Sequence, residues 1–175
     1  NKKRRKIMKH KHTLSVLVRN EAGVLSRVSD LFSGRGFNIE SLTVAPTLDS
    51  EYSRITIVTN GEDRIIEQIT KQLNRLIPVL KVVDVTLDDA IEVEVVLCKV
   101  TARDELRSEI LRIAEIFNAK IIDVSPKTYT LQAIGDTREI TSLIELLRPI
   151  GIKELVKSGK VAISRENQFI NLKNV

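Results

Sequence analysis

The sequence predicts an α+β protein built from two βαββαβ units in tandem. Hydrophobic periodicity switches repeatedly between two residues, typical of a strand, and about three and a half, typical of a helix. The resulting order of elements occurs once in each half of the chain. The two halves also contain short segments of similar sequence: "RVSDLF" at 27–32 resembles "RIAEIF" at 112–117, and "VAP" at 44–46 resembles "VSP" at 124–126. An internal repeat explains these matches, and βαββαβ is the split arrangement of ferredoxin-like folds.

The first half holds the elements of the first predicted domain, residues 12–87. "HTLSVLVRN" alternates apolar residues and predicts a strand, and "VLSRVSDLF" gathers its apolar residues on one helical face. "FNIESLTVAP" and "SRITIVTNG" predict two strands joined by the polar turn "TLDSEY". "EDRIIEQITKQLNRLI" predicts a helix with Glu67 facing Lys71 and with Leu76 inward, and Pro78 ends this helix. "VLKVVDVTL" predicts the fourth strand.

The second half repeats this order in a predicted domain of residues 88–166. "IEVEVVLCKVT" predicts a strand, "RDELRSEILRIAEIFN" a helix, and "AKIIDVSP" and "TYTLQAIG" two strands. "TREITSLIELLR" predicts a helix that Pro149 stops, and "IKELVKSGKVAISR" a last strand or strand pair. Asp88 and Asp89 are neighbours on an extended segment and predict a polar turn between the domains. Residues 167–175 form a tail.

The composition is that of a soluble globular protein. Charged residues make up 29% and hydrophobic residues 42% of the 175 residues, and no apolar run approaches the ~20 residues of a membrane helix. The basic start has no apolar stretch of the kind that follows it in a secretory signal. The lone Cys98 lies between apolar neighbours, which predicts a buried structural thiol. We therefore expect a cytoplasmic protein, or a plastid stromal one if the source is a photosynthetic eukaryote.

The sequence pI of about 9.4 comes from one end of the chain. Residues 1–12 hold seven of the 28 Lys and Arg, so the remaining 21 face 23 Asp and Glu, a net charge of −2. Residues 1–11 are expected to form a flexible basic arm, although such an arm could also contact phosphate. His10 and His12 lack Cys or carboxylate neighbours at ligand spacing and are predicted to lie on the surface. No metal site is expected in either half.

Two turns of the first half, "NEAG" and "GRGFN", have no counterpart in the second half, and turns often carry function. Gly23 stands where a helix begins, so the amide groups of residues 23–25 would point outward with the positive end of the helix dipole. Asn20 and Asn38 each offer an amide. The apolar flanks of these turns are Val24, Leu25 and Ile39. This arrangement would suit a small zwitterion with a branched side chain, while Asn and Gly are also common turn formers.

A longer set of motifs carries a resemblance to a known family. The run "LSVLVRNEAGVLSRVSDLFSGRGFNIESLTVAPT", with "SRITIVT", "KIIDVSP" and "VKSGKVAISR", resembles the small regulatory subunit of acetolactate synthase, also called acetohydroxyacid synthase. The likeness covers residues 12 to about 166. It implies that the first domain is an ACT domain, a ferredoxin-like amino-acid-sensing module, and that the second is particular to the family.

The resemblance also implies how an effector is held. Subunits pair through their ACT sheets, and a feedback inhibitor, commonly valine, lies between them. The matching positions are Asn20, Gly23, Val24 and Leu25 from one subunit and Asn38 and Ile39 from the other. Ala22 stands where relatives often have Pro or Ser, which should alter the stiffness of the loop more than its ligand contacts.

No catalytic residues are expected in this chain. The sequence has no phosphate loop, no metal-spaced Cys or His cluster and no Ser/His pairing. The resemblance implies a separate catalytic subunit that binds thiamine diphosphate, Mg²⁺ and FAD and joins two 2-keto acids in branched-chain amino acid synthesis. This chain would activate that partner and confer feedback inhibition by valine or another branched-chain amino acid.

Two other classes share this topology. RNA-binding modules stack bases on aromatic residues of the central strands, but aromatics are only 3% of this chain and "SRITIVTNG" is β-branched instead. An acylphosphatase-like enzyme would use an Arg for phosphate and an Asn for water, and Arg19 and Asn20 alone support that reading. Both alternatives are weaker than the regulatory subunit.

Overall fold

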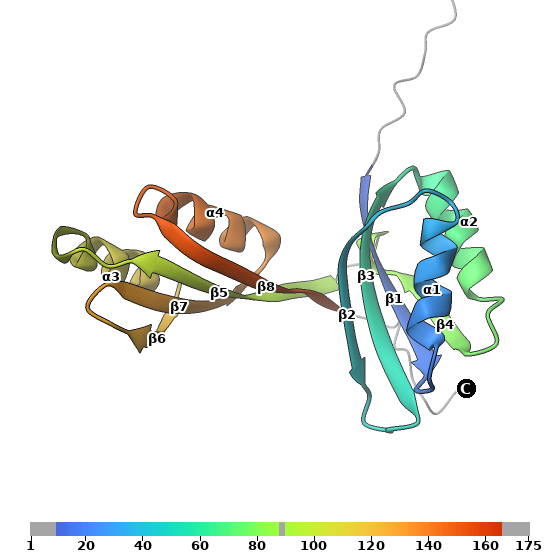
Figure 1. Ribbon diagram of the computed structural model, residues 1–175. Coiled ribbons are helices and arrows are strands. Elements are labelled where there is room, and N and C mark those ends of the chain that lie inside the picture. Colours follow the sequence, from blue (N-terminus) through green and yellow to red (C-terminus); the bar gives the residue numbers. More distant parts are fainter. Residues whose placement is uncertain (1–9, 88–89, 166–175) are drawn as a thin grey trace, which may run out of the picture. The chain divides into compact units, whose positions relative to one another are not determined.

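The computed structural model describes residues 10–87 and 90–165, and they form two compact units. The first unit consists of two segments of the chain, one that ends at Ile91 and one that begins at Ala162. The second unit is Glu92–Val161. Each unit is a four-stranded antiparallel sheet with two helices in βαββαβ order (Figure 1). The predicted fold class is confirmed.

The first unit has the strand order β2-β3-β1-β4, which places β2 at one edge of its sheet. Its elements are β1 (His10–Arg19), α1 (Val24–Ser33), β2 (Ile39–Pro46), β3 (Tyr52–Gly61), α2 (Asp63–Leu73), β4 (Val79–Asp84) and a 3-10 turn η1 (Val85–Leu87). Figure 1 shows α1 and α2 side by side on one face of this sheet. Alternate residues Leu14, Val16 and Val18 of β1 are buried in the cluster that contains Phe32 of α1, as the periodicity predicts.

The second unit has the matching strand order β6-β7-β5-β8. Its elements are β5 (Ala90–Thr101), a 3-10 turn η2 (Asp104–Leu106), α3 (Arg107–Ile116), β6 (Lys120–Val124), β7 (Thr128–Gly135), α4 (Thr137–Leu147) and β8 (Ile152–Ser164). The core again lies between sheet and helices, and Val96, Cys98 and Val100 of β5 point into it. The predicted burial of Cys98 is confirmed, with 1% of its surface exposed.

Several element boundaries differ from the sequence predictions. Helix α2 ends at Leu73, so Leu76 packs against the core from a turn rather than from a helix. The first helix predicted in the second half begins with the 3-10 turn η2, which precedes α3. The last segment is one strand, β8, which continues through Gly159 at a φ of 84°. The predicted pair of Glu67 and Lys71 is confirmed at 2.7 Å, and this hydrogen bond lowers the pKa of Glu67.

The prediction that His12 lies on the surface is wrong, whereas His10 is exposed. Strand β1 begins at His10, inside the segment expected to be an arm, and His12 pairs with Thr59 of β3. The His12 ring is 2% exposed because the start of α2 and the end of β4 meet over it.

The other predictions for the chain ends concern residues outside the described ranges. These are residues 1–9 of the arm, the tail 167–175, and Asp88 and Asp89. Across residues 10–87 and 90–165, no helix is long and apolar enough to cross a membrane.

Candidate effector site

The turn between β1 and α1 leaves the start of a helix open. Gly23 is the residue before α1 and has a φ of 83°, a left-handed conformation that suits glycine. The first helical hydrogen bond runs from the Arg27 amide to the Gly23 carbonyl, at 3.1 Å. No acceptor within the described ranges is recorded for the amides of residues 24–26. These groups and the helix dipole make this end attractive to a carboxylate.

Helix α1 differs from the other described α-helices in its first turn. It has no acidic residue there, whereas α2 carries Asp63, α3 Glu109 and α4 Glu139 in the first turn. Acidic side chains near a helix start compete with any external anion for the same amides. The open end of α1 is therefore the position, among these helices, where an external carboxylate meets no competing side chain.

Asn20 is tied into the turn by part of its amide. Its Nδ2 donates to the carbonyl of Ser50 at 2.9 Å, and its backbone amide donates to Glu51 at 2.7 Å. The side chain thus links the β1–α1 turn to the β2–β3 hairpin, which is a structural role. Its Oδ1 has no recorded partner in the described part of the chain and remains free to accept from an ammonium group.

The apolar residues that follow Gly23 point in different directions. Val24 is only 4% exposed and packs in the core, so it can offer a ligand its backbone amide but not its side chain. Leu25 is 42% exposed and presents an apolar surface beside the open helix end. A Cβ at Gly23 would meet no atom within 4 Å, which leaves space for a ligand next to the backbone.

The second predicted turn joins α1 to β2. Gly36 adopts a φ of 70°, and the Phe37 amide returns to the Phe32 carbonyl at 3.0 Å. The Asn38 carbonyl accepts from Thr59 Oγ1 at 2.8 Å, and its side chain is exposed. Ile39 is partly buried and packs against the core.

These two turns lie at opposite ends of the sheet in one chain. The end of β1 pairs with β3 at Arg19 and Tyr52, whereas the start of β2 pairs with β3 at Ile39 and Thr59. Seven residues of an antiparallel strand separate the two pairings on β3, which corresponds to roughly 24 Å. One copy of the chain therefore does not bring Asn20 and Gly23 together with Asn38 and Ile39.

The second unit does not repeat the open helix end. At the start of α3, Arg107 Nη2 donates to the Pro126 carbonyl at 3.0 Å and pairs with Asp104 at 2.9 Å. At α4, the Asp136 carboxylate accepts from the amides of Arg138 and Glu139. The Asp136 carboxylate thus occupies the α4 amides that an external anion would need, and Glu109 places a negative charge in the first turn of α3.

Comparison with known proteins identifies the family. The acetolactate synthase small subunit of Aquifex aeolicus is 50% identical to this chain over 163 residues, which are 93% of this chain and 85% of that protein. The chain belongs to the family of acetolactate synthase small subunits. The probable acetolactate synthase small subunit of Archaeoglobus fulgidus is 48% identical, over 90% of this chain and 99% of that protein.

Family models and a solved structure agree with this membership. Residues 14–81 match the model described as "AHAS small subunit-like ACT domain", and residues 93–166 match "Small subunit of acetolactate synthase". The crystal structure of the acetolactate synthase small subunit from Thermotoga maritima superposes with a TM-score of 0.82 at 38% identity, covering 90% of this chain and 99% of that one. As a small subunit with an ACT domain, the chain has a regulatory rather than a catalytic role.

Proposed function

We propose that this chain binds the catalytic subunit of acetolactate synthase, raises its activity and makes it sensitive to inhibition by valine or another branched-chain amino acid. The observation that carries the proposal is the start of α1, which has neither a side-chain cap nor an acidic residue in its first turn, with the exposed Leu25 beside it. The thiamine diphosphate, Mg²⁺ and FAD would be bound by the catalytic subunit and not by this chain. We place both subunits in the cytoplasm.

The effector would use three features of the β1–α1 turn. Its carboxylate would accept hydrogen bonds from the amides that follow Gly23, and its ammonium group would donate to Asn20 Oδ1. Its branched side chain would contact Leu25. None of these contacts needs a catalytic group, which fits a sensing role.

Asn38 and Ile39 would complete the site from a second copy of the chain. Because they lie at the other end of the sheet in the same copy, only a dimer can place them against the β1–α1 turn. Strand β2, at the edge of the sheet in the first unit, offers the strand through which two ACT sheets could pair. The proposed active form is therefore a homodimer with two effector sites, each built from two chains.

The carboxylate position is tested with Gly23→Asp and its isosteric control Gly23→Asn. Both residues tolerate a left-handed φ better than other side chains, but only Asp adds a charge that occupies the amides and repels the ligand. We expect Gly23→Asp to weaken valine binding by roughly a hundredfold and Gly23→Asn to weaken it much less. Calorimetry on the isolated chain gives the affinity, and activity of the reconstituted enzyme against valine concentration gives the sensitivity. A folded Gly23→Asp protein that binds valine normally would refute this site.

The two-chain site is tested by mixing two variants that are each expected to bind valine poorly. Gly23→Asp and Asn38→Asp chains each lack one half of every site, so each homodimer should bind valine poorly. In the mixed dimer, one site combines the intact Gly23 of one chain with the intact Asn38 of the other. Valine binding should therefore return after the two are unfolded and refolded together, and sedimentation should show dimers throughout. Failure of the mixture to recover binding would refute a site built from Gly23 of one chain and Asn38 of the other.

A further inference from the structure

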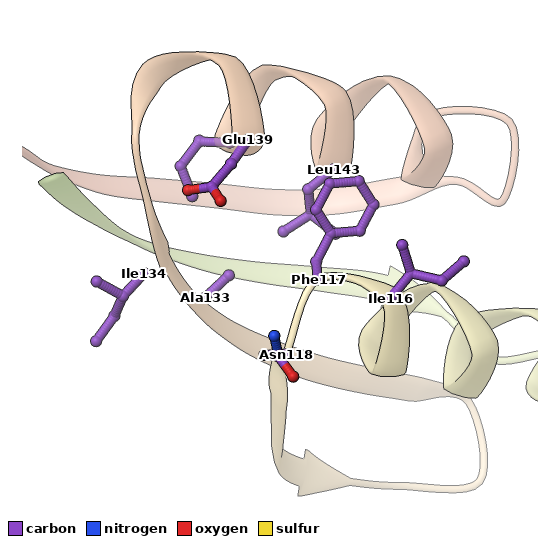
Figure 2. A pocket seen from close by; sticks show the side chains of 8 residues that line it. Ile116, Phe117, Asn118, Ala133, Ile134, Glu139 and Leu143 are labelled. Atoms are coloured by element: carbon purple, nitrogen blue, oxygen red, sulfur yellow. The ribbon is translucent and has the colours of Figure 1, made fainter.

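The second unit contains a pocket of about 180 Å³ between α4, the end of β7 and the turn after α3. Phe117, Ala133 and Leu143 form apolar walls, and Ile116 and Ile134 lie at its exposed rim. The polar lining residues are Asn118 and Glu139. Figure 2 shows the Glu139 carboxylate and the Asn118 amide extending toward this space from different elements, α4 and the turn after α3.

The internal repeat shows how the two units differ beside this pocket. Gly61 and Gly135 are equivalent, because each ends a strand and immediately precedes the residue that caps the next helix. In the first unit the Phe37 ring lies against Gly61, with its Cε1 3.3 Å from the position of an added Cβ, and Ile66 lies beside it. Phe37 and Ile66 therefore cover Gly61 in the first unit, whereas the Glu139 side chain covers Gly135 in the second, where its Oε2 lies 2.6 Å from the position of an added Cβ.

The connection between the first helix and the second strand, which carries Phe37 in the first unit, is shorter in the second unit. Helix α1 and strand β2 are joined by residues 34–38, which include Phe37, whereas α3 and β6 are joined by residues 117–119. Ile140, the equivalent of Ile66, instead lines the pocket. The pocket, with its volume of about 180 Å³, thus has room for a compact apolar group supplied from outside the unit.

The carboxylates at this pocket favour a positively charged ligand. Asp136 and Glu139 form a capping box, in which Glu139 Oε2 accepts from the Asp136 amide at 2.9 Å. This hydrogen bond holds the carboxylate of Glu139 in place at the pocket, and no partner of its Oε1 is recorded within residues 10–87 and 90–165. None of the lining residues is basic. A bound anion would be repelled by both carboxylates, whereas an ammonium group would gain a charge-assisted hydrogen bond.

We propose that this pocket binds a small primary ammonium compound that carries a compact branched or aromatic group. The ammonium group donates to Glu139 Oε1, and the apolar group occupies the space between Phe117, Ala133 and Leu143. Asn118 can accept from the ammonium of a simple amine or donate to the carboxylate of a free amino acid. Both sources share the recognised chemistry, and the site is independent of the effector site proposed in the first unit.

The ligand class is tested on the full-length ¹⁵N-labelled chain carrying Gly23→Asp, which disables the proposed site of the first unit. The probes are 3-methylbutylamine, leucine and 3-methylbutanoate, which share the branched group and differ in charged groups. We expect the amine, the amino acid or both to shift the amide signals of residues 133–143, and 3-methylbutanoate to leave them unchanged. The proposal would be overturned if neither 3-methylbutylamine nor leucine shifted these signals at millimolar concentrations, or if 3-methylbutanoate shifted them equally.

The role of Glu139 is tested by Glu139→Gln, because the Gln carbonyl oxygen can still accept from the Asp136 amide. This change keeps the helix cap and removes the charge, so the probe that binds should bind at least ~10-fold more weakly. Glu145→Gln removes the same charge from the same helix outside the pocket lining and should leave the affinity unchanged. Equal losses in both variants would show only a general effect of charge and refute the site.

Filling the pocket provides an independent variant. Ala133→Leu adds a side chain to the pocket wall, so it should abolish the signal shifts caused by every probe. Amide spectra that retain the native dispersion would show that the unit is folded. Undiminished probe binding in such a folded variant would place the ligand elsewhere and refute the proposal.

Discussion

His12 is a buried side chain whose two ring nitrogens both face carboxylates. Its Nδ1 lies 2.9 Å from Asp84 Oδ2, and its Nε2 lies 3.2 Å from Asp63 Oδ1. The first contact is a hydrogen bond, whereas the second lacks hydrogen-bond alignment. The ring thereby connects the start of β1 to the end of β4 and the start of α2.

We expect His12→Ala to destabilise the first unit by about 2 kcal/mol, because it removes a buried hydrogen bond and leaves a cavity. His10→Ala is the matched control, since His10 is exposed two residues earlier on the same strand. Residue-resolved hydrogen exchange measures the stability of each unit separately. Equal effects of the two substitutions would contradict the structural role of His12.

Cys98 is predicted to be unreactive in the folded protein. Burial raises the pKa of its thiol from an ordinary value of 9.0 to about 11, and the thiolate is the form that reacts with alkylating agents. At pH 8 we expect iodoacetamide to modify Cys98 slowly in the native chain and readily in urea. The unfolded thiol ionises first as pH rises, so this group favours unfolding increasingly between about pH 9 and pH 11. Fast alkylation of the native chain at pH 8 would show that Cys98 is accessible.

Equivalent helices of the two units are capped differently. The α4 N-cap, Asp136, accepts from two backbone amides, whereas the α2 N-cap, Glu62, makes no side-chain capping bond. Asp136→Ala should therefore destabilise the second unit by ~1 kcal/mol, and Glu62→Ala should change the first unit by much less. Urea unfolding followed by circular dichroism gives both values. A larger effect at Glu62 would mean that the capping box of α4 contributes little.

The elements could be predicted because their signals are local. Alternation along β1 and helical spacing along α1 are visible in the sequence, and so is the absence of an acidic residue after Gly23. The burial of His12 could not be predicted, because it depends on β4 and α2 meeting over β1. The pocket also had no sequence signal that was recognised, although the missing counterpart of Phe37 could have pointed to it. The residues of the candidate effector site were predicted from the sequence, but the structure was needed to show that the Val24 side chain is buried in the core.

The first unit depends on residues from both sides of the second. Val83 and Val85 form a small buried cluster with Ala162, and Ala90 packs against it. This cluster is separate from the main core of the unit, which consists of residues up to Val79. A fragment that ends at residue 91 should therefore fold but lose part of its stability.

The contribution of Ala162 can be measured in the full chain. Ala162→Asp places a carboxylate in this apolar cluster and should destabilise the first unit by ~2 kcal/mol or more. Ile163→Asp is the control, because Ile163 is the next residue and is 52% exposed. Hydrogen exchange of the β1 amides reports the result. If Ile163→Asp has the larger effect, the small cluster does not support the first unit.

The return of the chain to the first unit at Ala162 makes the second unit an insertion rather than an appendage. Its two ends lie on the neighbouring strands β5 and β8, where Lys160 pairs with Glu92 at 2.7 Å. Because its entrance and exit are adjacent, residues 92–161 form a cassette that could be exchanged or removed with only a short turn to close the gap. The first unit could thus be joined to a different inserted domain without interrupting its own fold.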